Sequence, residues 1–96
     1  MAWRMITNRK RTVPRDAHLD TVTTVGVHIV EFSVDATLDK GYPWPSMAGT
    51  VEVTPWRDQE IMQYYHALFG GKVARRQRYR NKWGPWTEII FQPVGV

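Results

Sequence analysis

The clearest alternation of apolar and polar positions lies near the middle of the chain, at residues 49–54. Val51 and Val53 alternate there with polar side chains, which is the period-two pattern of a strand with one buried face. Residues 27–34 (VHIVEFSV) are rich in β-branched and aromatic side chains and also predict a strand. The even positions of this second strand are expected to be buried: Val30, Phe32 and Val34.

Residues 58–69 (DQEIMQYYHALF) fit both a helix and a strand. A helix would begin at the N-cap Asp58 and end at Gly70, and periodicity cannot separate the two alternatives over so short a span. The following residues favour the strand, because residues 72–78 alternate as a two-sided strand. The sequence Phe-Gly-Gly at residues 69–71 suits a hairpin connection between the two.

A third short strand, residues 87–91, would follow a turn at residues 81–85. Near the N-terminus, residues 16–24 predict one helical turn, with Leu19 and Val22 directed inward. We therefore predict a mainly β fold, a small α+β domain in which an antiparallel meander sheet follows a short N-terminal helical turn.

Residues 35–46 (DATLDKGYPWPS) are predicted to form a loop, because Gly41 and Pro43 interrupt regular structure. The loop also carries Tyr42 and Trp44. Aromatic side chains in such a loop either pin it to the core or face outward and stack on a ligand, and the sequence leaves both alternatives open.

The composition sets limits on the class of protein. Ninety-six residues make one domain with a modest core, which five Trp, four Tyr and three Phe enlarge. The chain has no Cys, which excludes disulfides and thiolate metal sites. No apolar stretch is long enough for a signal peptide or a membrane span, so we expect a chain made as a soluble protein without membrane insertion.

The formal net charge of +4 comes from two basic blocks, residues 4–15 and 72–82. We interpret residues 1–15 as a basic N-terminal arm and residues 16–96 as the folded domain. The arm is either a solvated tail or a docking segment. Its candidate docking residues are Trp3, Arg9, Lys10 and Arg11.

The second basic block combines cations with aromatic rings. The basic side chains are Arg75, Arg76, Arg78, Arg80 and Lys82. Together with Tyr79, Trp83 and Trp86 they would suit single-stranded nucleic acid, with charge along the backbone and rings under the bases. The same residues also suit an outer strand, where cations guard the edge against strand addition and their stems cover aromatic rings.

Residues able to carry catalysis are sparse. His18, His28 and His66 include no short-range pair with metal-ligand spacing. Ser33 and Ser46 lie outside any nucleophile motif, and Gly-Gly-Lys at residues 70–72 is too short for a phosphate-binding loop. We therefore predict neither an enzyme nor a metal or cofactor site.

The order of several short motifs resembles the pyocin-knob type domain of phage tail fibres and tailocin fibres. In chain order, the motifs are LDTVTTVGV at residues 19–27, GYP at 41–43, GTVEV at 49–53, Gln63 with Tyr64, Arg76, and WGPWTEI at 83–89. The resemblance covers residues 16–91 and implies a strand, not a helix, at residues 60–68.

This resemblance implies a small β module of a virion-associated, usually trimeric fibre or tail part, made in the host cytoplasm. Its role would be structural or in host-surface attachment, with other virion proteins and a host surface glycan as candidate partners. Framework or interface residues are then expected at Tyr42, Arg76, Trp83 and Trp86. Candidate rings for stacking on a saccharide are Tyr42, Trp44 and Trp56. A small basic nucleic-acid-binding protein is the alternative function.

Overall fold

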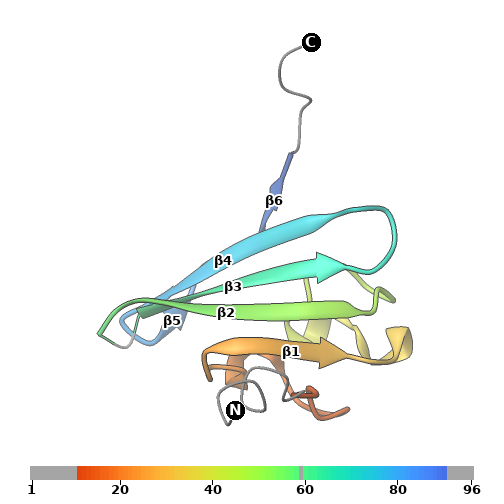
Figure 1. The fold of residues 1–96 in the computed structure, drawn as a ribbon, viewed down its shortest axis with the longest axis horizontal. Helices are drawn as coiled ribbons and strands as arrows, with labels where there is room; N and C mark the ends of the chain where they lie inside the picture. Colours follow the sequence, from red (N-terminus) through yellow and green to blue (C-terminus); the bar gives the residue numbers. More distant parts are fainter. Residues whose placement is uncertain (1–10, 59, 91–96) are drawn as a thin grey trace, which may run out of the picture.

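The computed structural model of the chain describes residues 11–58 and 60–90. Its main feature is one antiparallel sheet of six strands, in which β1 to β5 follow one another and β6 pairs with β4 beside β5 (Figure 1). The strands are β1 (Gly26–Val30), β2 (Gly49–Arg57), β3 (Glu60–Ala67), β4 (Val73–Tyr79), β5 (Lys82–Trp83) and β6 (Thr87–Ile89). This confirms the predicted mainly β meander.

Three short 3-10 turns make up the remaining regular structure of the described residues. They are η1 (Leu19–Thr21), η2 (Ser33–Asp35) and η3 (Leu38–Lys40). The first is the predicted N-terminal helical turn, and Leu19 and Val22 are buried as expected. No helix in the described part of the chain has the length and apolar character needed to cross a membrane.

The central strands β2 and β3 bury one side chain in every two. In β2, Val51 and Val53 are fully buried, as their alternation predicts. In β3 the buried side chains are those of Ile61, Gln63 and Tyr65. The segment that fits both a helix and a strand is therefore a strand, because its backbone is paired with β2 on one side and β4 on the other.

The predicted strand at residues 27–34 is correct only in its first part. β1 ends at Val30, and Phe32 and Val34 are 48% and 71% exposed, so the expectation that they are buried is wrong. The cause is the end of the ladder: Val30 pairs with Gly49, the first residue of β2. Beyond that pair the chain has no strand to bond with, and it turns away through η2.

The sheet has one covered face. Side chains from the segments before β1 and between β1 and β2, including Val13, Leu19 and Tyr42, form the core together with the inward side chains of β1, β2 and β3. We call residues 11–25 the leader and residues 31–48 the loop. Figure 1 shows fainter, more distant segments behind the strands. The opposite face of the sheet is uncovered by the described residues.

The leader is attached to the free edge of β1. Val13 donates its backbone N–H to the carbonyl oxygen of Ile29 (2.9 Å), and Ile29 donates to the carbonyl oxygen of Arg11 (2.7 Å). Val13 is buried in the core. The other candidate docking residues, Trp3, Arg9 and Lys10, lie outside the described residues, so the N-terminal arm and its limit at residue 15 stay predictions.

Two turns at opposite ends of the sheet need left-handed backbone conformations. Arg80 and Asn81 have φ values of 52° and 65° and form a two-residue hairpin turn between β4 and β5. Gly70 and Gly71, at 80° and 62°, connect β3 to β4. The turn predicted at residues 81–85 thus begins one residue earlier and contains the short strand β5.

Candidate functional site: a guanidinium clamp

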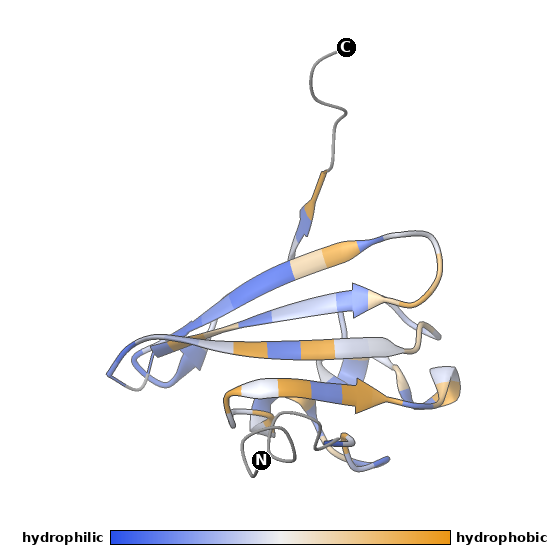
Figure 2. Cartoon of the chain, viewed as in Figure 1, coloured by the Kyte–Doolittle hydropathy of each residue, from blue (hydrophilic) through white to orange (hydrophobic). Residues whose placement is uncertain are grey.

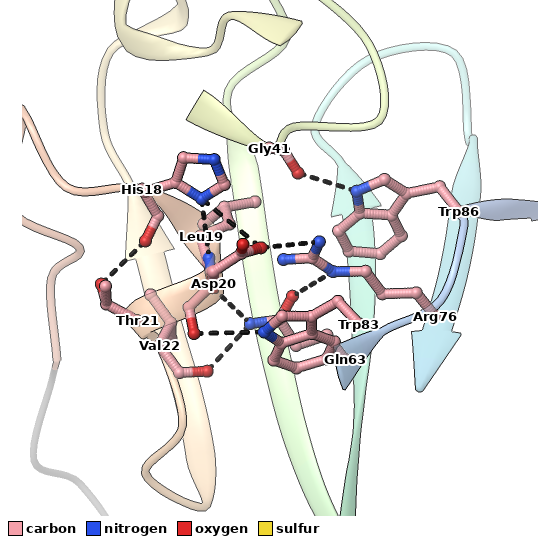
Figure 3. Close-up of polar contacts among 10 residues, drawn as sticks. All are labelled: His18, Leu19, Asp20, Thr21, Val22, Gly41, Gln63, Arg76, Trp83 and Trp86. Carbon is pink, nitrogen blue, oxygen red and sulfur yellow. Dashed lines mark hydrogen bonds and ion pairs between the residues drawn. The ribbon is translucent and has the colours of Figure 1, made fainter. Parts of the chain in front are cut away.

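Arg76 lies in the middle of β4 with its side chain on the covered face of the sheet. It pairs across the ladder with Gln63, and its Nε donates to Gln63 Oε1 at 2.9 Å. Its Nη1 lies 2.9 Å from Asp20 Oδ1. Arg76 is only 7% exposed, so a charged group sits inside the domain with two specific partners (Figure 3).

Two tryptophans hold the same guanidinium. Its Cζ lies 4.2 Å from the centroid of the Trp83 ring and 4.6 Å from that of the Trp86 ring, which are cation–π distances. The intervening residues, Gly84 and Pro85, carry the chain from β5 past the edge of β4, where Gly84 donates its N–H to the carbonyl oxygen of Gln77 (2.9 Å). The spacing Trp-x-x-Trp therefore brings both indoles to one arginine.

We call the cluster of Asp20, Gln63, Arg76, Trp83 and Trp86 the clamp. It also joins distant segments through hydrogen bonds to backbone carbonyl groups. Gln63 Nε2 donates to the carbonyl oxygens of Leu19 (2.7 Å) and Val22 (2.8 Å). Trp83 Nε1 donates to the carbonyl oxygen of Asp20 (3.2 Å), and Trp86 Nε1 to that of Gly41 (2.7 Å). The leader, the loop, the sheet and the closing segment (residues 82–89) meet at this one cluster.

Burial and charge act in opposite directions on Arg76. Loss of solvent lowers the pKa of its guanidinium, while the charge of Asp20 and the hydrogen bond to it raise the pKa. An arginine remains protonated under these conditions, so the cluster holds a permanent cation. Its Nη2 has no hydrogen-bond partner within the described part of the chain.

Aromatic packing continues from the clamp into the core. The Tyr65 ring meets the Trp86 ring edge-on at a centroid distance of 6.5 Å and the Tyr42 ring at 5.6 Å. The Tyr65 hydroxyl donates to the carbonyl oxygen of Met47. Burial raises the pKa of Tyr65 and also that of Tyr42. Tyr42 thus pins the loop to the core.

Known proteins similar to this chain include one solved structure. No protein-family model and no curated protein matches the sequence. A solved structure, the N-truncated R2-type pyocin tail fiber, matches with a TM-score of 0.69 and 27% sequence identity. This chain is similar in sequence and fold to part of a pyocin tail fibre. The match covers 83% of this chain and 32% of the fibre structure, and it confirms the family resemblance found in the motif order.

The three aromatic residues proposed to stack on a saccharide do not lie together in the structure. Tyr42 is 3% exposed, so its ring is unavailable to a ligand. Trp44 packs against the core, with Lys72 Nζ 5.2 Å from its ring centroid. Trp56 lies near the C-terminal end of β2, whereas Trp44 precedes the start of this strand. Trp56 is 56% exposed, and the Arg57 guanidinium lies 4.5 Å from the centroid of its ring.

The predicted basic surface is divided between the two faces of β4. Arg76 is inside the clamp and Arg78 is half-buried on the same face, whereas Arg75 points to the uncovered face. Arg80 and Lys82 are exposed at the β4–β5 turn. The rings of Trp83 and Trp86 are in contact with Arg76. Of the three rings proposed for stacking on bases, Tyr79 alone is exposed, at 42%, with the Arg80 guanidinium 5.2 Å from its centroid.

Some clamp residues carry no clear sequence signal. Asp20 and the carbonyl oxygen of Gly41 act only through the tertiary structure. His18 Nδ1 accepts the N–H of Asp20 at 3.1 Å, and a Cβ at Gly41 would lie 2.6 Å from His18 Cε1. A glycine requirement in the Gly-Tyr-Pro motif is the one hint of this contact. The described residues contain no group of His, Asp or Glu side chains that could hold a metal ion.

Proposed function

We propose that this domain is a structural module of a phage or tailocin particle, as part of a tail fibre or as a decoration protein. The observation that carries the proposal is the match to a pyocin tail fiber over 83% of the chain at 27% identity. The clamp supports a structural role, because the Arg76 guanidinium, the Gln63 amide and both indole N–H groups bond to other groups within the domain. The protein would be made in the host cytoplasm and incorporated into the virion.

The decisive experiment is to look for the protein in particles. Particles from a producing strain would be purified on a density gradient and their proteins identified by mass spectrometry. We expect the chain to be present at a fixed ratio to the tail proteins. Its absence from intact particles, while it is abundant in the lysate, would overturn the proposal.

Assembly into a trimer is part of the proposed function. A domain of this size buries a limited core, and association with other copies would cover more apolar surface. Light scattering on the purified chain is expected to give a mass near three chains at both low and high salt.

Host attachment is assigned to the exposed aromatic side chain at the β2–β3 end of the domain. Trp56 has the ring exposure that saccharide stacking requires, while Tyr42 does not. Trp56→Ala is expected to weaken binding of the particle to host cells, and Leu38→Ala, at another exposed apolar position, is the matched control. Equal loss of binding in both variants, or in neither, would contradict a role for Trp56.

A further inference from the structure

The uncovered face of the sheet is built from complete rows of side chains. Residues directly opposite each other in antiparallel strands share a face. One row consists of Val27, Glu52, Tyr64, Arg75 and Thr87, and the next of Ile29, Thr50, His66, Val73 and Ile89. We call the surface formed by these two rows, with Thr54, Met62 and Gln77 of the following row, the open face.

The open face is more apolar than a solvated sheet surface. Antiparallel sheets that face water on one side usually alternate between apolar inward and polar outward residues. Here nearly half of the outward positions are apolar: Val27, Ile29, Met62, Tyr64, Val73 and Ile89. Next to this face, the β3–β4 turn carries Leu68 and Phe69, which are 66% and 74% exposed. Figure 2 shows orange, hydrophobic colour in part of this turn and blue, hydrophilic colour at the opposite end of β4.

Opposite charges flank the centre of the open face. Tyr64 lies in the central strand, with Glu52 on one side and Arg75 on the other. Arg75 makes no ion pair with any described residue, and the only such pair of Glu52 is with His66 Nε2 at 3.2 Å. The face is therefore acidic on its β2 side and basic on its β4 side.

We propose that the open face docks a second copy of this chain, with Glu52 of one copy beside Arg75 of the other. With the threefold symmetry of the proposed trimer, an axis parallel to β3 and the open faces directed towards it, the β2 side of one copy lies against the β4 side of the next. The charges that meet are then opposite in sign, and Ile29 of one copy lies near Ile89 of the other. The inference deepens the proposed function by naming the surface through which copies associate.

The size of the open face agrees with this occupant. Eight residues of β3 at about 3.3 Å each, and five strand positions about 4.8 Å apart, give roughly 600 Å² of projected area. A standard interface takes about 800 Å² of accessible surface from each partner. The open face is therefore of the same order as the surface that each partner contributes to a standard interface.

Charge reversal tests the pairing directly. The variants are Glu52→Arg, Arg75→Glu and the double variant that carries both, and their association is measured by light scattering over a concentration series. Each single reversal is expected to weaken association by about tenfold or more, since like charges then face each other. The double variant restores opposite charges and is expected to associate like the wild type. Circular dichroism establishes that all variants are folded.

The control is Asp16→Arg, an exposed acid-to-arginine change in the leader, away from the open face; it is expected to leave association unchanged. Three outcomes overturn the inference: a wild-type chain that is monomeric throughout, single reversals that associate normally, and a double variant no better than the singles. A monomer would leave the face to a different partner. Failure of the proposed function is recognised separately, by absence of the chain from purified particles.

Discussion

Arg76 shows how a single side chain can decide the arrangement of several segments. Its guanidinium contacts Gln63, Asp20 and two indole rings, and these groups come from the sheet, the leader and the closing segment. A buried cation is tolerated only where such partners replace the lost solvent. Hence replacement of this residue should affect the whole domain rather than one strand.

Arg76→Met should destabilise the domain by about 2–4 kcal/mol. The change removes two cation–π contacts and leaves the buried Gln63 Oε1 without its donor. Urea denaturation followed by tryptophan fluorescence measures the effect, with the exposed Lys82→Met as control, expected within about 0.5 kcal/mol. A midpoint unchanged by Arg76→Met would show that the clamp does not hold the fold.

The buried tyrosines predict a pH dependence. Burial raises the pKa of Tyr65 and Tyr42 in the folded state, while the unfolded chain ionises them near pH 10. The unfolded state then binds fewer protons than the folded state, so their contribution to stability is fully present below about pH 10. It is lost as pH rises from there through the folded pKa values.

We therefore expect the free energy of unfolding to fall less steeply above about pH 10 in Tyr65→Phe than in the wild type, and least steeply when Tyr42→Phe is added. Denaturant titrations at several alkaline pH values give these slopes. At neutral pH Tyr65→Phe costs about 1 kcal/mol, because the carbonyl group of Met47 loses its donor. Equal slopes in the wild type and the double variant would refute the prediction.

The sequence predicts single residues better than their contacts. The motif order identifies Gln63, Arg76 and the two tryptophans, but nothing in it places them around one guanidinium. Asp20 lies within the motif at residues 19–27, but the sequence predicts no role for it, because an acidic residue in a polar leader has no local signature. Contacts between residues so far apart depend on the completed sheet, and local pattern cannot supply them.

At the scale of elements, the period-two pattern predicts a strand correctly where the segment has a neighbouring strand on each side. Residues 49–54 and 60–67 are strands because each is paired on both sides, and their alternating side chains follow. Residues 31–34 have the same composition as a strand and are not one, because β2 begins only at Gly49. Propensity alone therefore could not place the end of β1.

Gly49 fixes the point at which the first three strands come together. A Cβ there would lie 2.1 Å from the carbonyl oxygen of His66, which is backbone and cannot move without breaking the β2–β3 ladder. Gly49→Ala is expected to destabilise the domain by about 3 kcal/mol or more. Gly71→Asn is the contrasting variant and should cost about 1 kcal/mol or less, since Asn tolerates left-handed φ values and open space surrounds that position. Thermal denaturation compares them, and similar losses in both would contradict the steric explanation.

At the scale of the whole molecule, the placement of the basic run leads to a prediction about the nucleic-acid alternative. The cations of β4 lie on different faces of the sheet, and the rings of Trp83 and Trp86 are in contact with Arg76. A single-stranded oligonucleotide should therefore bind no more tightly than the roughly 1–100 µM of non-specific contacts at physiological salt. Fluorescence anisotropy at several salt concentrations tests this. Submicromolar binding that weakens steeply with salt would favour the nucleic-acid alternative.

The clamp also has a consequence for the way the domain is synthesised. Its hydrogen bonds to the leader and the loop join residues 41 to 63 positions apart in the sequence, and its last contributor along the chain is Trp86. A nascent chain cannot lock its leader in place until Trp83 and Trp86 have both left the ribosome. Folding of the domain therefore depends on contacts between residues far apart in the sequence, and we expect it to be slow for the domain's length.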